Sequence, residues 1–191
     1  MREFELKSAR FIAADCLRRF LVPGDIAVDA TMGNGHDTEM LCRLVGEGGH
    51  VYAFDIQEDA VENTRARLSQ AGLLARATLF CCGHQFMAEK VNKAVNAVMF
   101  NLGWLPGGNK AITTQWDTTR EAVQQALSLL APEGICAICV YPGHPAGDYE
   151  RLQLNQMLSS LRPQEFNVLH HRFINAGKGA PECYIIQKQT V

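Results

Sequence analysis

The sequence lacks several features that would each place it in a different class of protein. No stretch reaches the roughly 18 consecutive apolar residues that cross a membrane, and Glu3 and Glu5 stand where signal peptides carry no acids. Positive charge is not in excess, because 18 Lys and Arg face 20 Asp and Glu. This balance excludes a globally basic, histone-like grip on nucleic acid. We therefore expect a cytoplasmic protein with no membrane partner.

Cysteine pairs of the kind that hold zinc or form disulfide frameworks are also missing. The chain has seven cysteines, an odd number, and the only close neighbours are Cys81 and Cys82. It has no CxxC pair and no His at zinc-finger spacing. We expect reduced thiols in a packed core and no metal site.

What the sequence does contain is an alternation of helical and strand patterns. Its 191 residues are 47% hydrophobic, which suits a single domain over 1–191 with one core. Helical periodicity is found at 6–21, 39–45, 58–70, 118–130 and 149–161. Apolar strand patterns are found at 25–30, 50–54, 77–81, 94–100 and 135–141. This alternation predicts an α/β fold with a Rossmann-like, doubly wound, mostly parallel sheet. Segments 165–174 and 183–187 complete seven strands as an antiparallel edge hairpin.

The strongest local motif follows the first predicted strand and precedes a helix. Residues 29–37 read D-A-T-M-G-N-G-H-D, so that Gly33 and Gly35 let the backbone turn sharply and approach a ligand. The third glycine of the dinucleotide-binding GxGxxG pattern is missing. Asp29 lies just upstream, where it would repel a pyrophosphate and accept a hydrogen bond from a cationic amino-acid headgroup. The motif favours a zwitterionic ligand over NAD.

A second acid closes the next predicted strand. Asp55 occupies the place where a carboxylate accepts the hydroxyls of a ribose. The alternative is that the glycine motif is a plain turn and Asp55 a helix cap. A ligand with an amino-acid part and a ribose part is S-adenosylmethionine, which we predict as the cofactor.

Three further predicted strand ends supply residues to the same crevice. Gly83 and His84 follow the third strand, Asn101 ends the fourth, and His144 lies in the loop after the fifth. The side-chain carbonyl of Asn101 can accept a hydrogen bond from an amine nucleophile, and Trp104 can pack against a planar base. For His84 and His144 a purely structural role is an equal alternative.

Taken together, these residues resemble a known family. The blocks D-A-T-M-G-N-G-H-D-T at 29–38 and N-L-G-W-L-P-G-G-N-K at 101–110 resemble the small bacterial rRNA methylase family, and the resemblance covers nearly the whole chain. Members of that family are class I S-adenosylmethionine-dependent methyltransferases. Their characterised activity is methylation of the amine of 5-aminomethyl-(2-thio)uridine at the wobble position, 34, of tRNA.

The resemblance also implies roles for single residues. It places cofactor contacts at Asn34, Asp37, Asp55, Gln57 and His84, and it places Asn101 where the methyl donor and acceptor meet. The sequence departs from the family's pattern in two places, one expected near the adenine and one expected near the substrate. Cys82 and Gly83 replace the Asp-Ser that the family commonly has before His84, and residues 173–181 depart from the family's pattern near the C-terminus.

A primary amine is mostly protonated at pH 7, so a site that methylates it must help to remove a proton. We hypothesise that Asn101 orients the amine and that His84 or His144 assists proton removal. Two other readings stay open. One is a methyltransferase that acts on an rRNA base or a small molecule, and the other is a non-catalytic cofactor- or RNA-binding protein.

The predicted partner is tRNA, gripped at its anticodon region. Positive residues are dispersed, apart from Lys7, Arg10, Arg18 and Arg19 on the first predicted helix, which we interpret as an ordinary solvated face. Contact with RNA should therefore be small and local, centred on one exposed nucleotide. The sequence does not fix the oligomeric state, and a homodimer remains open.

Overall fold

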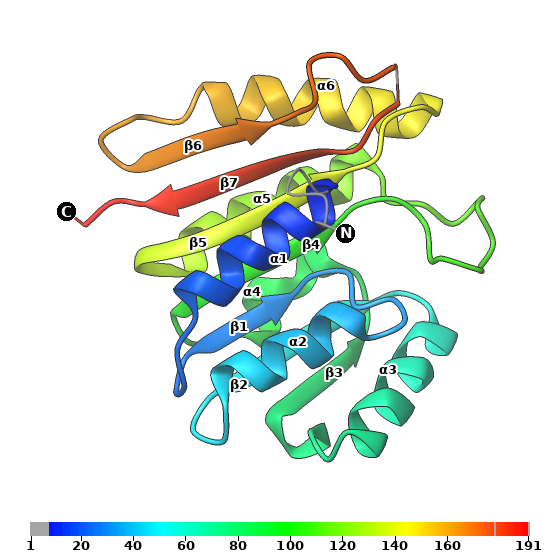
Figure 1. Ribbon diagram of the computed structural model, residues 1–191, viewed down its shortest axis with the longest axis vertical. Coiled ribbons are helices and arrows are strands. Elements are labelled where there is room, and N and C mark those ends of the chain that lie inside the picture. Colours follow the sequence, from blue (N-terminus) through cyan, green and yellow to red (C-terminus); the bar gives the residue numbers. More distant parts are fainter. Residues whose placement is uncertain (1–7, 178, 191) are drawn as a thin grey trace, which may run out of the picture.

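A seven-stranded sheet forms the centre of the molecule, in the order β3-β2-β1-β4-β5-β7-β6 (Figure 1). The computed structural model describes residues 8–177 and 179–190. The strands are β1 (Ile26–Asp29), β2 (His50–Asp55), β3 (Ala77–Cys81), β4 (Val95–Asn101), β5 (Leu130–Val140), β6 (Phe166–His171) and β7 (Glu182–Lys188). The α-helices are α1 (Ala9–Phe20), α2 (His36–Val45), α3 (Glu58–Gln70), α4 (Met87–Lys90), α5 (Trp116–Leu129) and α6 (Pro145–Ser159), with 3-10 turns η1 (Leu74–Arg76) and η2 (His84–Phe86).

The predicted doubly wound sheet with an antiparallel edge is confirmed. Strands β1 to β5 pair in parallel, whereas β7 runs antiparallel to both β5 and β6. The order reverses between β1 and β4, so the carboxyl ends of these two strands diverge into loops that cover opposite faces. In doubly wound sheets this is the place where a crevice for a ligand opens.

Two hydrophobic cores cover the two faces of the sheet. Helices α1, α2 and α3 lie on one face, and α4, α5 and α6 lie on the other (Figure 1). Leu17 of α1 and Leu41 of α2 are fully buried in the first core, while Val123 of α5 and Leu154 of α6 are fully buried in the second. The strands between them are apolar on both sides, as a doubly covered parallel sheet requires.

Several helices begin earlier than the sequence pattern predicts, for local reasons. Helix α2 begins at His36, directly after Gly35, whose left-handed φ of 78° lets the chain turn from the loop into the helix. Helix α6 begins at Pro145 because Pro suits the first turn of a helix and the side chain of His144 caps it. The first helix ends at Phe20, one residue before the predicted end at 21, and residues 6 and 7 of that prediction lie outside the described residues.

Candidate active site

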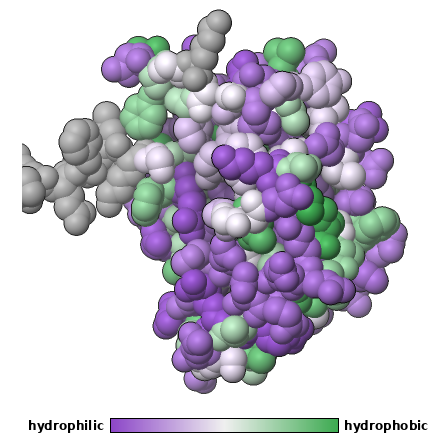
Figure 2. Space-filling model, turned by 90° about the vertical axis from the view of Figure 1, so that its right-hand side faces the viewer, coloured by the Kyte–Doolittle hydropathy of each residue, from purple (hydrophilic) through white to green (hydrophobic). Residues whose placement is uncertain are grey.

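The predicted site residues come from loops at one edge of the sheet. Because β1 to β5 are parallel, their carboxyl ends share that edge, which is on the right in Figure 1 and faces the viewer in Figure 2. The loop after β4 extends well beyond the strand ends (Figure 1). Figure 2 shows that this face is mainly hydrophilic, with scattered apolar patches. The polar groups of the edge can therefore meet a polar ligand.

The glycine loop between β1 and α2 can be built only with glycine at Gly35. Both Gly33 and Gly35 have left-handed φ angles, of 50° and 78°. A Cβ added to Gly35 would lie 2.9 Å from the Cα of Thr64 on α3, closer than packing allows. Thr64 in turn donates a hydrogen bond from its hydroxyl to the Gly33 carbonyl, at 3.0 Å. The loop is thus pressed against α3 and held open toward the sheet edge.

Asp55 has the geometry of an acceptor for a pair of hydroxyls. One carboxylate oxygen accepts from the Gly33 backbone N–H and the other from the Gln57 backbone N–H, both at 3.0 Å. A carboxylate has about four acceptor sites, so about two remain for a ligand. Burial raises the pKa of Asp55, while the two backbone N–H groups lower it. Next to it, Ile56 is 61% exposed, an apolar surface on which a planar base can pack.

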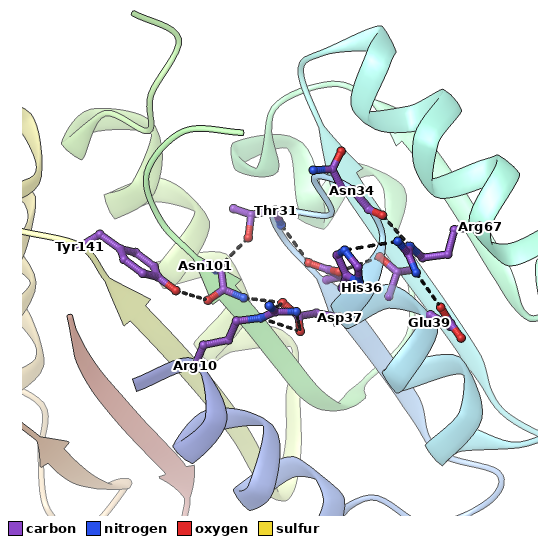
Figure 3. Close-up of polar contacts among 11 residues, drawn as sticks. Arg10, Thr31, Asn34, His36, Asp37, Glu39, Arg67, Asn101 and Tyr141 are labelled. Atoms are coloured by element: carbon purple, nitrogen blue, oxygen red, sulfur yellow. Dashed lines mark hydrogen bonds and ion pairs between the residues drawn. The ribbon is translucent and has the colours of Figure 1, made fainter. Parts of the chain in front are cut away.

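Asn34 fixes the tip of the glycine loop to two neighbours. Its side-chain amide donates to the Pro106 carbonyl in the loop after β4, at 3.1 Å, and its side-chain oxygen accepts from Asn63 at 3.0 Å. Arg67 donates to the Asn34 backbone carbonyl at 2.8 Å and pairs with Glu39 at 3.2 Å (Figure 3). Asn34, a predicted cofactor contact, therefore lies where the loop after β1 meets the loop after β4.

Asp29 lies beneath the glycine loop, fully buried. Its carboxylate accepts from the Thr38 hydroxyl at 2.6 Å and from the Thr31 backbone N–H at 3.2 Å. Burial, followed by the negative charge of Asp37, raises the pKa of Asp29 to about 7. The structure thus gives Asp29 an internal role in the loop, and its contact with the amino group of a ligand stays a prediction.

Asp37 and Asn101 are the centre of a side-chain network (Figure 3). Arg10 of α1 donates from two nitrogens to the Asp37 carboxylate, at 2.9–3.2 Å. The Asn101 amide nitrogen donates to the same carboxylate at 2.6 Å, and the Tyr141 hydroxyl donates to the Asn101 amide oxygen at 3.3 Å. The interpretation of Arg10 as part of a solvated helix face is wrong, because Asp37 draws its guanidinium into the site.

This network sets the direction of the Asn101 amide. The NH2 group faces the anion Asp37, so the oxygen must face away, toward Tyr141. The Asn101 backbone N–H donates to the Thr31 hydroxyl at 2.7 Å, which fixes the end of β4 against the glycine loop. The amide oxygen keeps a second acceptor site for an N–H group of a substrate.

The two candidate proton acceptors differ in what they can do. His84 is 93% removed from solvent, and this burial lowers its pKa to about 4, so its ring is neutral at pH 7. Its Nδ1 lies 3.2 Å from the Ala30 carbonyl, which can only accept, so Nδ1 carries the hydrogen and Nε2 the lone pair. The preceding residue is Gly83, where an added Cβ would collide with the Gln85 side chain.

His144 uses its lone pair as a helix cap. The Gly147 backbone N–H donates to Nδ1 at 3.2 Å, so in the neutral ring Nε2 carries the hydrogen. That Nε2 is buried and has no partner among the described residues. The ring packs against Trp104, with 4.8 Å between centroids. In this arrangement His144 presents a donor to its surroundings, and its part in proton removal stays a prediction.

A buried carboxylate behind the site holds the loop that follows Asn101. Glu150 of α6 is only 2% exposed and accepts from the hydroxyls of Thr119, at 2.5 Å, and Thr114, at 2.9 Å. The Thr114 hydroxyl in turn accepts from the Gly103 backbone N–H at 2.9 Å. This chain of bonds runs from the core to the loop backbone two residues after Asn101.

Arg10, Tyr141 and Glu150 are the residues of this site that the sequence did not reveal. Each acts through a partner at least 27 positions away, and local patterns carry no trace of such pairs.

The described part of the chain holds neither a metal cluster nor a membrane-spanning helix. No group of three or more His, Cys, Asp or Glu side chains there is arranged to hold a metal ion. None of the helices within residues 8–177 and 179–190 has both the length and the apolar character needed to cross a membrane.

Comparison with known proteins points to one family. The family model described as "Putative rRNA methylase" matches residues 51–187. The chain is 43% identical, over 157 residues, to a chloroplastic tRNA (mnm(5)s(2)U34)-methyltransferase of Arabidopsis thaliana. That match covers 77% of this chain and 57% of the plant protein, so the chain spans little more than half the length of this curated relative.

Solved structures from the same group of proteins share the fold. A "putative rRNA-methylase" from Clostridium thermocellum superimposes with a TM-score of 0.95 at 38% identity, over 97% of this chain and all of the other. A "putative methyltransferase" from Streptococcus mutans, solved in complex with S-adenosylhomocysteine, gives a TM-score of 0.87 at 35% identity, over 96% and 99% of the two chains. The predicted class I methyltransferase fold is therefore confirmed.

Proposed function

Because the chain belongs to this rRNA methylase family, we propose that it is an S-adenosylmethionine-dependent methyltransferase that modifies tRNA. Its substrate is the amine of 5-aminomethyl-(2-thio)uridine at wobble position 34, and its product is the 5-methylaminomethyl nucleoside. The observation that carries this proposal is the Asn101 amide oxygen, held by Asp37 and Tyr141 where it can accept an amine N–H. The tRNA activity named for the Arabidopsis relative supports the choice of substrate.

The cofactor is S-adenosylmethionine. The Streptococcus mutans relative was solved with S-adenosylhomocysteine, the molecule that remains after the methyl group has been transferred, which agrees with this choice. When bound, it supplies a methyl group already activated on a sulfonium. In this chain Asp55 would receive the ribose hydroxyls, the backbone of Gly33 and Gly35 would approach the amino-acid part, and Ile56 would pack on the adenine. The remaining proposed contacts at the cofactor side are Asp29, Asn34, Asp37, Gln57, Gly83 and His84.

The chain's own residues then have two tasks. The first is alignment: Asn101 holds one N–H of the amine so that the nitrogen lone pair points at the methyl carbon. The second is removal of a proton, because the nitrogen gains a bond to carbon as the carbon–sulfur bond breaks. His84 is neutral and keeps its Nε2 lone pair. Because its pKa is about 4, it would pass the proton on to water and would not stay protonated at pH 7.

A transfer assay tests the proposed substrate. The purified protein is incubated with methyl-labelled S-adenosylmethionine and three RNA pools: tRNA that carries 5-aminomethyluridine, fully modified tRNA, and rRNA. Label in the first pool alone, recovered as 5-methylaminomethyluridine, is the expected result. Label in rRNA alone would instead favour the activity in the family's description, and silence on every pool would favour a non-catalytic protein.

A further inference from the structure

A groove of about 500 Å³ lies beside the proposed transfer site and has no role in it so far. One wall is formed by the loop after β5 and the start of α6. The other wall is the connection from β6 to β7, at the upper right of Figure 1. Its walls include Pro142, Arg151, Arg172, Phe173 and Pro181. A volume of this size holds a ligand no larger than about one or two nucleotides.

Two arginines line the groove without forming an ion pair among the described residues. Among residues 8–177 and 179–190, neither Arg151 nor Arg172 has a carboxylate within ion-pair distance. Burial and the negative charge of Glu182 raise the pKa of the Tyr184 phenol, and both guanidinium groups lie close enough to oppose that rise. They therefore act on the same small region.

The two acids in the wall of the groove are already engaged elsewhere. Asp148 accepts from the Gly143 backbone N–H at 3.1 Å, and Glu182 lies 2.8 Å from the ring of His170. These bonds hold the two carboxylates toward the loop and β6, and no ion pair joins either of them to Arg151 or Arg172 within the described residues. What the groove offers a ligand is a pair of guanidinium groups, which suit phosphate oxygens.

Apolar side chains stand beside these cations. Phe173 is 37% exposed and Ile174 is 90% exposed, and both lie in the segment that follows β6. Aromatic and guanidinium planes side by side are what proteins use to stack and neutralise single-stranded RNA. A protein partner would instead favour a larger and more apolar surface.

The groove begins at the residue that follows Tyr141 of the proposed transfer site. The Tyr141 hydroxyl contacts the Asn101 amide, and the next two residues, Pro142 and Gly143, line the groove. An RNA strand whose target base reaches Asn101 would therefore pass its neighbouring phosphates toward Arg151 and Arg172.

We propose that this groove binds the single-stranded RNA segment that flanks the target nucleotide. Arg151 and Arg172 contact its phosphates, and Phe173 stacks on a flanking base. The proposal rests on the proposed function for the identity of the RNA. It gives a role to residues 173–177 and 179–181, where the sequence departs from its family, in contacting the anticodon loop.

Binding of a fluorescently labelled anticodon stem-loop, followed by anisotropy over a range of salt concentrations, tests the groove. The variant is Arg151→Ala with Arg172→Ala, and the matched control is Arg18→Ala with Arg19→Ala, which removes the same charge from the exposed end of α1 at the opposite edge of the sheet. We expect the groove variant to bind RNA at least tenfold more weakly. The plot of log affinity against log salt should become shallower by about 1.4, as the loss of two phosphate contacts from a single strand predicts.

The control should bind RNA as the unaltered protein does, and both variants should keep their affinity for S-adenosylhomocysteine, which shows that the fold is intact. Phe173→Ala is an independent variant, expected to weaken binding several-fold without changing the salt slope. Unchanged RNA affinity in the double groove variant, or no RNA binding by the unaltered protein, would overturn the proposal. If the groove variant loses RNA binding but the unaltered protein leaves 5-aminomethyluridine unmethylated, the groove stands and the proposed substrate falls.

Discussion

The two halves of the carboxyl edge are built in different ways. On the cofactor side, at the ends of β1 and β2, backbone N–H groups of Gly33 and Gln57 both donate to Asp55, and side chains of α3 support the short glycine loop from outside. On the acceptor side, at the ends of β4 and β5, side chains from distant segments hold one another. Arg10 reaches Asp37 across 27 positions, and Asp37 reaches Asn101 across 64.

This difference indicates which half tolerates change. A site shaped by backbone depends on a few glycines and acids, and conservative changes elsewhere leave it intact. A site shaped by a side-chain network depends on each member, because removing one leaves its partners without a hydrogen bond. The cofactor side should therefore respond to mutation in binding and stability, and the acceptor side in turnover.

The largest effect is expected at Asn101. In Asn101→Ala the amine loses its acceptor and Asp37 loses a donor, so kcat for methyl transfer should fall by about 100-fold or more. The dissociation constant of S-adenosylhomocysteine, measured by calorimetry, should change little. Unchanged turnover would remove Asn101 from the mechanism and break the division between the two halves.

The next effect is expected at Gly35, on the cofactor side. Gly35→Ala combines a left-handed φ with a Cβ 2.9 Å from Thr64, so thermal or urea denaturation should show a loss of about 2–3 kcal/mol, with weaker cofactor binding. Gly72→Ala is the matched control, since Gly72 has a φ of 68° but nothing within 4 Å of the added Cβ. It should lose only about 1 kcal/mol. Equal losses would show that the contact with α3 is unimportant.

A pH effect should come from Asp29, which lies beneath the junction of the halves. Its pKa is raised to about 7 in the folded chain, above the ordinary value of 3.8, so between pH 4 and pH 7 the native state binds more protons than the unfolded state. Stability then falls as pH rises through this window, by at most about 1.4 kcal/mol per pH unit. Asp29→Asn, which removes the proton, should flatten the slope. An unchanged slope in denaturation at pH 4, 5.5 and 7 would contradict the buried, protonated carboxyl.

The smallest effect is expected at Arg10. Its ion pair with Asp37 is partly open to solvent, with 42% and 14% of the two side chains exposed, so Arg10→Ala should cost less than about 1 kcal/mol of stability. Turnover should fall roughly three- to tenfold, because Asp37 no longer has a fixed position for Asn101. Arg10→Lys should restore part of kcat. A change in the Michaelis constant alone would place Arg10 in binding instead of positioning.

The sequence predicted the fold well because its signals are local. Apolar runs ending in Asp29, Asp55 and Asn101 marked parallel strands, and the strands lie within a residue or two of the predicted bounds. There are two exceptions: β6 ends at His171 rather than 174, and β5 begins at Leu130 rather than 135, since residues that continue directly from α5 pair with β4 at Val95. Pairing with a neighbouring strand is a property of the sheet and not of the segment.

The site was predicted in its members but not in its connections. Spacing and glycine pattern brought Gly33, Asp55 and Asn101 to one edge, as the structure does. No local sequence pattern showed that Asp29 would be fully buried, or that the His144 lone pair would accept a hydrogen bond from the Gly147 N–H. Those outcomes depend on burial and on hydrogen-bond direction, which follow only from the packed chain.

The most direct test of the proposed function is nucleoside mass analysis of tRNA from cells that lack this protein. The proposal predicts that 5-aminomethyl-(2-thio)uridine accumulates and 5-methylaminomethyl-(2-thio)uridine disappears, and that the gene for the unaltered chain, but not for Asn101→Ala, restores the methylated nucleoside. An unchanged nucleoside profile would contradict it.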